Sequence, residues 1–385
     1  MEELTLLYQS YNAPLECPTA RTQWRGMEPA RSDSFSYNGR NELTASSLGA
    51  APYGYSYDNI GNRKTAREPA GELAYAANGL NQYTGIEESG EAPFVPTYDA
   101  SGNQTLIKTS TGIWTAVYNA ANRAVSFTSR DGATVVECGY DYQGRRYMKK
   151  VTQNGTVASH ERYLYRGYLQ IAALDMLDNR NVLRTLLWDP LEPMATRPLA
   201  LVQGASLYCY GVDFNKNVSE VFDAQGTIAA AYDYSPYGAV TGTGSLVQPV
   251  QWSGEMHDEE PVLAYYNYRF YNPKDGRWIN RDPIAEQGGL NLYCFLINYP
   301  PSIDYLGKIA IVLVIPLTIT AAEATAYAAI AAAGICLSNS YCSKLATAAF
   351  VAPILAAVAA AKAISSTICS IRCCLLYTSP SPRDP

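Results

Sequence analysis

The sequence has little positive charge and almost no histidine. Its 29 Lys and Arg are outnumbered by 35 Asp and Glu, which gives a formal net charge of -6. Because no long basic run neutralises phosphates, we expect no nucleic-acid partner. The only histidines are His160 and His257, which argues against a histidine-ligated metal centre, and no cofactor is expected.

Targeting segments and cysteine clusters are also missing from the first 308 residues. The start, Met1-Glu2-Glu3, lacks the basic and apolar regions of a signal peptide. No stretch before Lys308 is apolar enough to cross a bilayer. The cysteines there are widely scattered, which is typical of isolated thiols and not of a disulfide framework or a zinc site. They are Cys17, Cys138, Cys209 and Cys294.

What the sequence has instead is tyrosine and glycine. It contains 31 Tyr and 28 Gly, and only 17% of its residues are charged. This composition favours many short strands joined by tight turns, so we predict a mainly β fold.

A pattern of an aromatic residue followed by Asp-x-x-Gly recurs with a period of about 41 residues. Its copies are Tyr57 to Gly61, Tyr98 to Gly102, Tyr140 to Gly144 and, two periods later, Phe222 to Gly226. A weaker Tyr and Asn signature lies between them, at Tyr37, Tyr75 and Tyr118. The repeating unit is therefore about 20 residues long.

Asp-x-x-Gly supplies a side-chain acceptor that begins a turn and a residue that tolerates positive φ at its end. Each unit is therefore predicted to be strand, turn, strand. The aromatic residue is expected to end its strand and to stack on its equivalent in the next unit, so that successive hairpins form one continuous sheet. A β-propeller or sandwich is the alternative.

This phased repeat resembles the RHS, or YD-repeat, family over roughly residues 30 to 308. The resemblance implies a spiralling antiparallel β-ribbon that forms a hollow shell, an architecture shared by teneurins and by the C component of insecticidal toxin complexes. Only part of a shell is expected, because the chain starts inside a repeat.

The segment from Tyr232 to Gly307 is similar to the RHS repeat-associated core. It contains Tyr-Asp-Tyr-Ser-Pro-Tyr-Gly at 232–238, Tyr-Arg-Phe-Tyr-Asn-Pro at 268–273, Arg-Asp-Pro-Ile at 281–284 and Asp-Tyr-Leu-Gly at 304–307. In relatives this core closes the shell and acts as an aspartyl autoprotease that releases the C-terminal segment, often a toxin. The resemblance implies no other enzymatic activity.

Carried over to this sequence, the resemblance makes Asp282 and Asp304 the catalytic carboxylates. Of two neighbouring carboxylates one keeps a proton while the other activates water. Arg281 or Arg269 is expected to hold the charged partner in place.

The expected cleavage point is at Gly307 or Lys308. Two positions depart from the family's Asp-Pro-x-Gly-Leu: Tyr305 replaces the proline and Lys308 the apolar residue. Alternatively, Asp282 and Asp304 only accept turn hydrogen bonds.

Other polar and aromatic residues are interpreted as structural. His257 is expected at the surface, and Asp258, Glu259 and Glu260 are expected in a solvated turn and not in a calcium site. Four tryptophans are expected to pack within the sheet. They are Trp114, Trp188, Trp252 and Trp278.

The tail is apolar. Ile309 to Leu337 and Leu345 to Ile371 contain one charged residue each, which indicates either transmembrane helices or a packed helical hairpin. The tail is then either a membrane-active passenger or, as we favour, the truncated start of a longer effector. Residues 374–385 resemble a translated sequencing adapter and are left out of the fold prediction.

The predicted parts are a partial β-ribbon (1–230), a core that plugs the shell (231–308), a hydrophobic helical tail (309–373) and the adapter-like end (374–385). The predicted function is a polymorphic toxin or secreted effector that encapsulates its own C-terminal segment and meets a secretion apparatus. The alternatives are a cell-surface structural or adhesive protein that binds a surface ligand, and a degenerate remnant. The expected location is secreted or at the cell surface, and residues 309–373 are expected to be the part that would contact a membrane.

Overall fold

The computed structural model describes residues 6–12, 17–23, 25, 28–190, 197–213, 215–299, 303–304, 306–308 and 310–311. The chain divides into two compact units, Met1–Ile315 and Pro316–Pro385. Residues 312–385, with most of the predicted helical tail, lie outside the described residues, as does Tyr305. Ala310–Ile311, which the prediction placed in the first tail helix, form a short strand instead. In the described part of the chain, no helix is long and apolar enough to cross a membrane.

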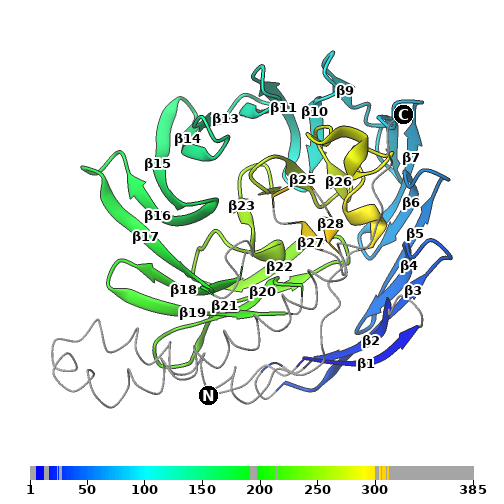
Figure 1. Ribbon diagram of the computed structural model, residues 1–385, viewed down its shortest axis with the longest axis horizontal. Coiled ribbons are helices and arrows are strands. Elements are labelled where there is room, and N and C mark those ends of the chain that lie inside the picture. Colours follow the sequence, from blue (N-terminus) through cyan, green and yellow to red (C-terminus); the bar gives the residue numbers. More distant parts are fainter. Residues whose placement is uncertain are drawn as a thin grey trace, which may run out of the picture. The chain divides into compact units, whose positions relative to one another are not determined.

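The first unit is built from two large antiparallel sheets in which neighbours in sequence are neighbours in space (Figure 1). The first sheet contains β1 (Leu6–Asn12), β2 (Cys17–Gln23), β3 (Arg31–Tyr37), β4 (Leu43–Leu48), β5 (Ala51–Tyr57), β6 (Arg63–Glu68), β7 (Gly71–Ala77) and β8 (Tyr83–Glu88). The second contains β9 (Thr97–Tyr98), β10 (Gln104–Thr109), β11 (Gly112–Tyr118), β12 (Ala124–Ser129), β13 (Thr134–Tyr140), β14 (Arg146–Gln153), β15 (Thr156–Arg166), β16 (Leu169–Asp175), β17 (Asn181–Trp188), β18 (Pro198–Gln203), β19 (Ser206–Val212), β20 (Val218–Phe222), β21 (Ile228–Tyr234) and β22 (Val240–Gly244). The predicted mainly β, antiparallel fold is confirmed. The second sheet continues beyond residue 230, where the sequence placed the end of the ribbon.

The prediction of one continuous sheet is wrong between β8 and β9. There, among the described residues, β8 pairs onward only through an isolated bridge between Ile86 and Phe94, and Phe94 precedes β9. Pro93 and Pro96 lie on either side of Phe94. Because proline has no N–H to donate to a ladder, the strand that should continue the ribbon is reduced to this one pair.

The predicted Asp-x-x-Gly corners are confirmed. Asp58 Oδ1 accepts hydrogen bonds from the N–H groups of Ile60 (3.0 Å) and Asn62 (2.8 Å), and Gly61 has φ 85°. The same geometry recurs at Asp99, Asp141 and Asp223. In the alternate units, Asn takes the positive-φ position instead of Gly, at Asn41, Asn81 and Asn122.

The tyrosines before these corners connect neighbouring strands through hydroxyl groups. At several positions the hydroxyl donates to the carbonyl of the first residue of the preceding strand. Such bonds join Tyr57 to Leu43, Tyr140 to Ala124 and Tyr234 to Val218, each at 2.7 Å. The Tyr98 hydroxyl instead accepts a hydrogen bond from the Tyr83 N–H at 3.1 Å. Ring stacking between equivalent aromatic residues, which we expected, does not join the units among the residues that the structure describes. Equivalent rings are two strands apart, about 9.5 Å, which is beyond the distance of a ring pair.

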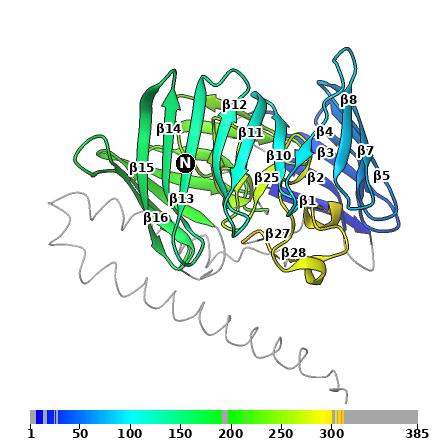
Figure 2. The same ribbon diagram turned by 90° about the horizontal axis from the view of Figure 1, so that it is seen from above.

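A smaller group of elements packs inside the curve of the two sheets (Figures 1 and 2). It contains η1 (Trp252–Gly254), β23 (Met256–Asp258), β24 (Leu263–Tyr265), β25 (Phe270–Asn272), β26 (Arg277–Trp278), η2 (Ala285–Gly288), η3 (Leu296–Asn298), β27 (Ile303–Asp304) and β28 (Ala310–Ile311). We call this group the plug. Ribbon and plug share one core, in which the rings of Phe127 and Phe270 lie 5.1 Å apart.

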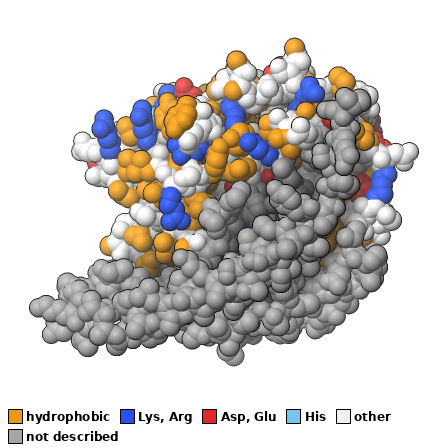
Figure 3. All heavy atoms as spheres, in the orientation of Figure 1, with side chains coloured by type: hydrophobic (Ala, Val, Ile, Leu, Met, Phe, Trp, Pro, Cys, Tyr) orange, Lys and Arg blue, Asp and Glu red, His pale blue; other side chains and the backbone are white. Residues whose placement is uncertain are grey.

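All four tryptophans singled out in the sequence are buried, but only Trp114 and Trp188 pack within the large sheet as predicted, whereas Trp252 and Trp278 belong to the plug. Trp114, Trp188, Trp252 and Trp278 are 4%, 4%, 5% and 1% exposed. On the described part of the face in Figure 3, Lys and Arg side chains are scattered among apolar and uncharged ones.

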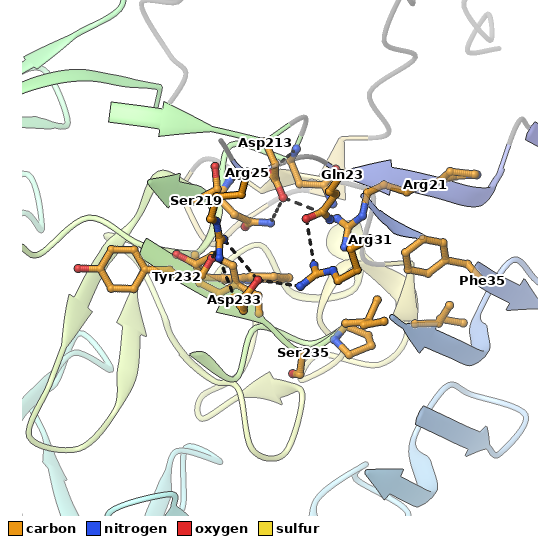
Figure 4. A pocket seen from close by; sticks show the side chains of 18 of the residues that line it. Arg21, Gln23, Arg25, Arg31, Phe35, Asp213, Ser219, Tyr232, Asp233 and Ser235 are labelled. Carbon is orange, nitrogen blue, oxygen red and sulfur yellow. Dashed lines mark hydrogen bonds and ion pairs between the residues drawn. The ribbon is translucent and has the colours of Figure 1, made fainter. Parts of the chain in front are cut away.

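An ionic seam joins β2 and β3 to β20 and β21, across the two sheets (Figure 4). Arg25 pairs with Glu220 (2.7 Å) and Asp233 (3.2 Å), and Arg31 pairs with Asp233 (2.8 Å). Arg25, Arg31 and Asp233 line a small cavity of about 70 Å³. Since these charges are satisfied by one another, the seam has a structural explanation: it fastens the beginning of the ribbon to its end.

Candidate functional site

Arg269 lies between the two carboxylates that the sequence singled out. Its Nη1 atom is 2.9 Å from Asp282 Oδ2, and its Nη2 atom is 3.1 Å from Asp304 Oδ2. The three side chains are 3%, 6% and 3% exposed, respectively. The plug therefore brings Asp282 and Asp304 to one buried guanidinium, although a long loop separates them in the sequence.

Asp304 occupies a corner of the same kind as those of the ribbon. Its Oδ1 atom accepts hydrogen bonds from the N–H groups of Leu306 (3.2 Å) and Lys308 (2.9 Å), and Gly307 has φ 70°. The N–H of Tyr268 donates to the Leu306 carbonyl at 3.0 Å, which fastens this corner to the plug. The corner thus forms without the proline of the family motif.

Asp282 is held by backbone groups of residues that follow it in the loop. Its Oδ1 atom accepts a hydrogen bond from the N–H of Ile284 at 3.0 Å, and its own N–H donates to the Leu292 carbonyl at 2.9 Å. A Cβ atom placed on Gly288 would lie 2.6 Å from Asp282 Oδ2 and 3.3 Å from the Lys308 carbonyl oxygen. The carboxylate and this carbonyl therefore approach the same point beside Gly288.

The electrostatics distinguish the members of the site. Burial raises the pKa of Asp282, although the charge of Arg269 opposes this shift. Burial also lowers the pKa of Arg269, against the attraction of Asp304 and Asp282. The guanidinium carbon lies 4.0 Å from the centre of the Trp278 ring, which adds a cation–π contact. Asp282 is accordingly suited to hold a proton.

The three side chains line a cavity of about 280 Å³. Gly288, Asn291 and Arg40 are among its other lining residues. A water molecule occupies about 30 Å³ of liquid, so this cavity has room for a nucleophilic water beside the carboxylates.

The structure separates the two arginines that the sequence left as alternatives. Arg269 contacts both carboxylates, whereas Arg281 is exposed. The Arg281 Cδ atom lies 2.6 Å from where a Cβ of Gly102 would be, so its stem packs against a ribbon corner.

A family model described as Teneurin YD-shell matches residues 20–298. The chain belongs to this family. The RHS, or YD-repeat, resemblance drawn from the tyrosine corners is thereby confirmed.

The YD shell is also similar to curated proteins over part of their length. It is 26% identical over 248 residues to the tRNA3(Ser)-specific nuclease WapA of Bacillus spizizenii, covering 62% of this chain and 10% of that protein. It is 27% identical over 278 residues to the toxin subunit YenC2 of Yersinia entomophaga, covering 64% of this chain and 28% of that protein. It is 40% identical over 78 residues to the toxin protein Tse5 of Pseudomonas aeruginosa, covering 20% of this chain and 6% of that protein. The chain thus spans less than a third of each of these relatives.

Among solved structures, the crystal structure of TcdB2-TccC3-TEV has a similar fold. The TM-score is 0.56 at 18% identity, over 80% of this chain and 18% of that one. This likeness supports the shell architecture.

Two predictions about polar residues of the YD shell are wrong. Asp258 is 1% exposed, not solvated, and its carboxylate pairs with Arg146 (2.5 Å) and Lys149 (3.2 Å) of β14. His257 is partly buried and not fully at the surface, and burial lowers its pKa to about 4. Both lie on β23, which packs against the ribbon, so a buried charge there needs a partner from the ribbon.

Sequence reasoning missed two contacts at the site. The first is the approach of Gly288 to Asp282, and the second is a contact between Lys308 and Tyr268. Gly288 stands in the Gly-Gly pair of the core motif, which was the only signal for the first. Across the described part of the YD shell, no group of His, Cys, Asp and Glu has an arrangement suited to a metal ion.

Proposed function

We propose that this YD shell encloses its own C-terminal segment and frees it by cutting the peptide bond after Lys308. The observation that carries the proposal is the approach of Asp282, Asp304 and the Lys308 carbonyl around Arg269 and Gly288. Two carboxylates in a buried site beside a peptide carbonyl are the requirement of aspartyl proteolysis.

The chemistry follows from the environments of the two acids. Asp282, whose pKa burial raises, donates its proton to the Lys308 carbonyl oxygen. Asp304 takes a proton from water as the water oxygen attacks the carbonyl carbon. The C–N bond then breaks, and the nitrogen leaves as an amine with the proton held by Asp304. As the C=O bond re-forms, one of the two hydroxyl groups on that carbon returns its proton to Asp282, which restores both acids. Arg269 offsets the negative charge that passes between the carboxylates.

The names of the relatives support the toxin part of the proposal. Tse5 and YenC2 are named as toxins and WapA as a nuclease. These names support the proposal that the enclosed segment is an effector, and we propose with it that the protein is secreted through a secretion apparatus. The predicted hydrophobic tail, 309–373, would be the first part of that segment.

The test is mass spectrometry of the 385-residue chain and its Asp282→Asn and Asp304→Asn variants. We expect the parent chain to yield a fragment that ends at Lys308, and each variant to cut at least about 100-fold more slowly, as for the loss of a general acid or base. Arg281→Ala, which changes an exposed arginine next to Asp282, is the control and should cut at the parent rate. A parent chain that stays intact would contradict self-cleavage.

One observation favours a second function, a structural or adhesive shell without catalysis. The Asp304 corner repeats the hydrogen bonds of Asp58, so its carboxylate has a sufficient structural explanation. In that case Asp304→Asn and Asp58→Asn should lower the melting temperature by similar amounts, and no chain should be cut.

A further inference from the structure

Lys308, the position where the chain departs from the apolar residue of the family motif, packs against an aromatic ring. Its Nζ atom lies 3.5 Å from the centre of the Tyr268 ring. The backbones of the two segments are also joined, because the Tyr268 N–H donates to the Leu306 carbonyl. Tyr268 therefore contacts the residues before the proposed cut through both its backbone and its side chain.

The ribbon holds the Tyr268 ring in position. Its hydroxyl shares a hydrogen bond of 2.7 Å with the hydroxyl of Tyr168. The guanidinium carbon of Arg123 lies 4.1 Å from the ring centre, and Arg123 Nη1 donates to the Asn267 carbonyl at 2.5 Å. A ring fixed by two ribbon residues is prepared to receive a side chain without first being ordered.

Electrostatics support a cation on this ring. Burial opposes ionisation of Tyr268, but the hydrogen bond from Tyr168 and the charge of Lys308 outweigh burial and lower the pKa of the phenol. Lys308 thus stabilises the ionised form of this side chain.

We propose that Tyr268 is a specificity-determining residue of the cleavage site. It selects a basic residue, and the bond that is cut is the one on the carboxyl side of that residue. This inference rests on the proposed self-cleavage. Lys308 is held at two points, its side chain on Tyr268 and its N–H on Asp304 Oδ1 (2.9 Å). Two such points fix the carbonyl between them, which is the group that lies beside Gly288 and Asp282.

The test compares the cleavage rates of variants at Lys308 and Tyr268 in the 385-residue chain. Lys308→Arg should stay within about threefold of the parent, whereas Lys308→Leu and Lys308→Glu should be at least about tenfold slower, the scale of a partly buried cation–π contact. Tyr268→Phe keeps the ring and should stay within about threefold, but Tyr268→Leu should be at least about tenfold slower. Lys64→Glu, at an exposed lysine on β6, is the control for charge and should have no effect.

A rescue experiment excludes a merely structural effect. The double variant with Lys308→Glu and Tyr268→Lys places a negative charge at position 308 and a positive charge at position 268. Because these two charges attract each other, the double variant should cut at least about threefold faster than Lys308→Glu alone.

The failure of this inference can be told from that of the proposed function. If the parent is cut and needs Asp282, but Lys308→Leu is cut as fast or the bond lies elsewhere, the inference is overturned and the self-cleavage stands. If neither the parent nor any variant is cut, self-cleavage fails and the inference fails with it.

Discussion

Gly288 packs against Asp282 so closely that a Cβ atom added to Gly288 would lie 2.6 Å from the carboxylate Oδ2. Gly288→Ala should therefore displace the carboxylate and slow cleavage at least about tenfold, since small misplacements of reacting groups have large effects on rate. Gly85→Ala is a matched control, because a Cβ there would meet nothing within 4 Å. Equal cleavage rates for the two variants, followed by mass spectrometry, would contradict the assignment of Asp282.

Much of this arrangement was readable from the sequence. The Asp-x-x-Gly corners, the antiparallel order of the strands and the meeting of Asp282 with Asp304 at an arginine follow from local turn chemistry and family resemblance. The choice of Arg269 over Arg281 was not readable, because it depends on which side of a loop faces the core.

The pairing of Asp258 with Arg146 was likewise hidden. The two residues lie on strands of different sheets, β23 and β14, and no residue near Asp258 in the sequence indicates which side chain will pair with it. The break after β8 was present in Pro93 and Pro96, but a repeat that continues in phase on both sides concealed it.

Replacing Arg146 by Ala should destabilise the fold by about 3–5 kcal/mol, because it leaves the buried Asp258 carboxylate short of its closest partner. Lys150→Ala breaks the more exposed pair with Glu137 and should cost less than about 1 kcal/mol. Urea denaturation of the two variants provides the comparison. Similar midpoints would show that the Arg146 pair contributes no more than a surface pair.

His257 should make stability depend on pH between 6.5 and about 4. Burial lowers its pKa from 6.5 to about 4 in the fold, so in this window the unfolded chain binds a proton that the folded chain does not. Stability is then lost as the pH falls, by at most about 1.4 kcal/mol per pH unit.

Asp275 changes stability in the opposite direction between pH about 6 and the pKa of this group in the unfolded chain, because burial raises the folded pKa to about 6. Asp258, whose folded pKa lies well below the usual value, loses its contribution only below the unfolded value of about 3.9.

The measurement for His257 is therefore the difference between the parent and His257→Gln in urea midpoints at several pH values. We expect the variant to become more stable relative to the parent as the pH falls from 6.5 to 4, with no further change above 7. A difference that is flat across this window would mean that His257 titrates normally in the fold.

Gly102 and Gly226 occupy the same corner position, with φ 85° and 83°, but have different surroundings. A Cβ at Gly226 would meet nothing within 4 Å, whereas one at Gly102 would lie 2.6 Å from Arg281 Cδ and 2.7 Å from the Tyr293 hydroxyl. Gly226→Ala should therefore cost only the penalty of positive φ, about 1–2 kcal/mol. Gly102→Ala should cost about 1–3 kcal/mol more, because Tyr293 belongs to the plug and its hydroxyl donates to the Gly102 carbonyl at 2.7 Å.

Since that contact joins ribbon to plug, amide hydrogen exchange should also increase in the 290–298 segment for Gly102→Ala and not for Gly226→Ala. Equal losses of stability, without this change in exchange, would mean that the contact between Gly102 and Tyr293 does not stabilise the packing of the plug against the ribbon.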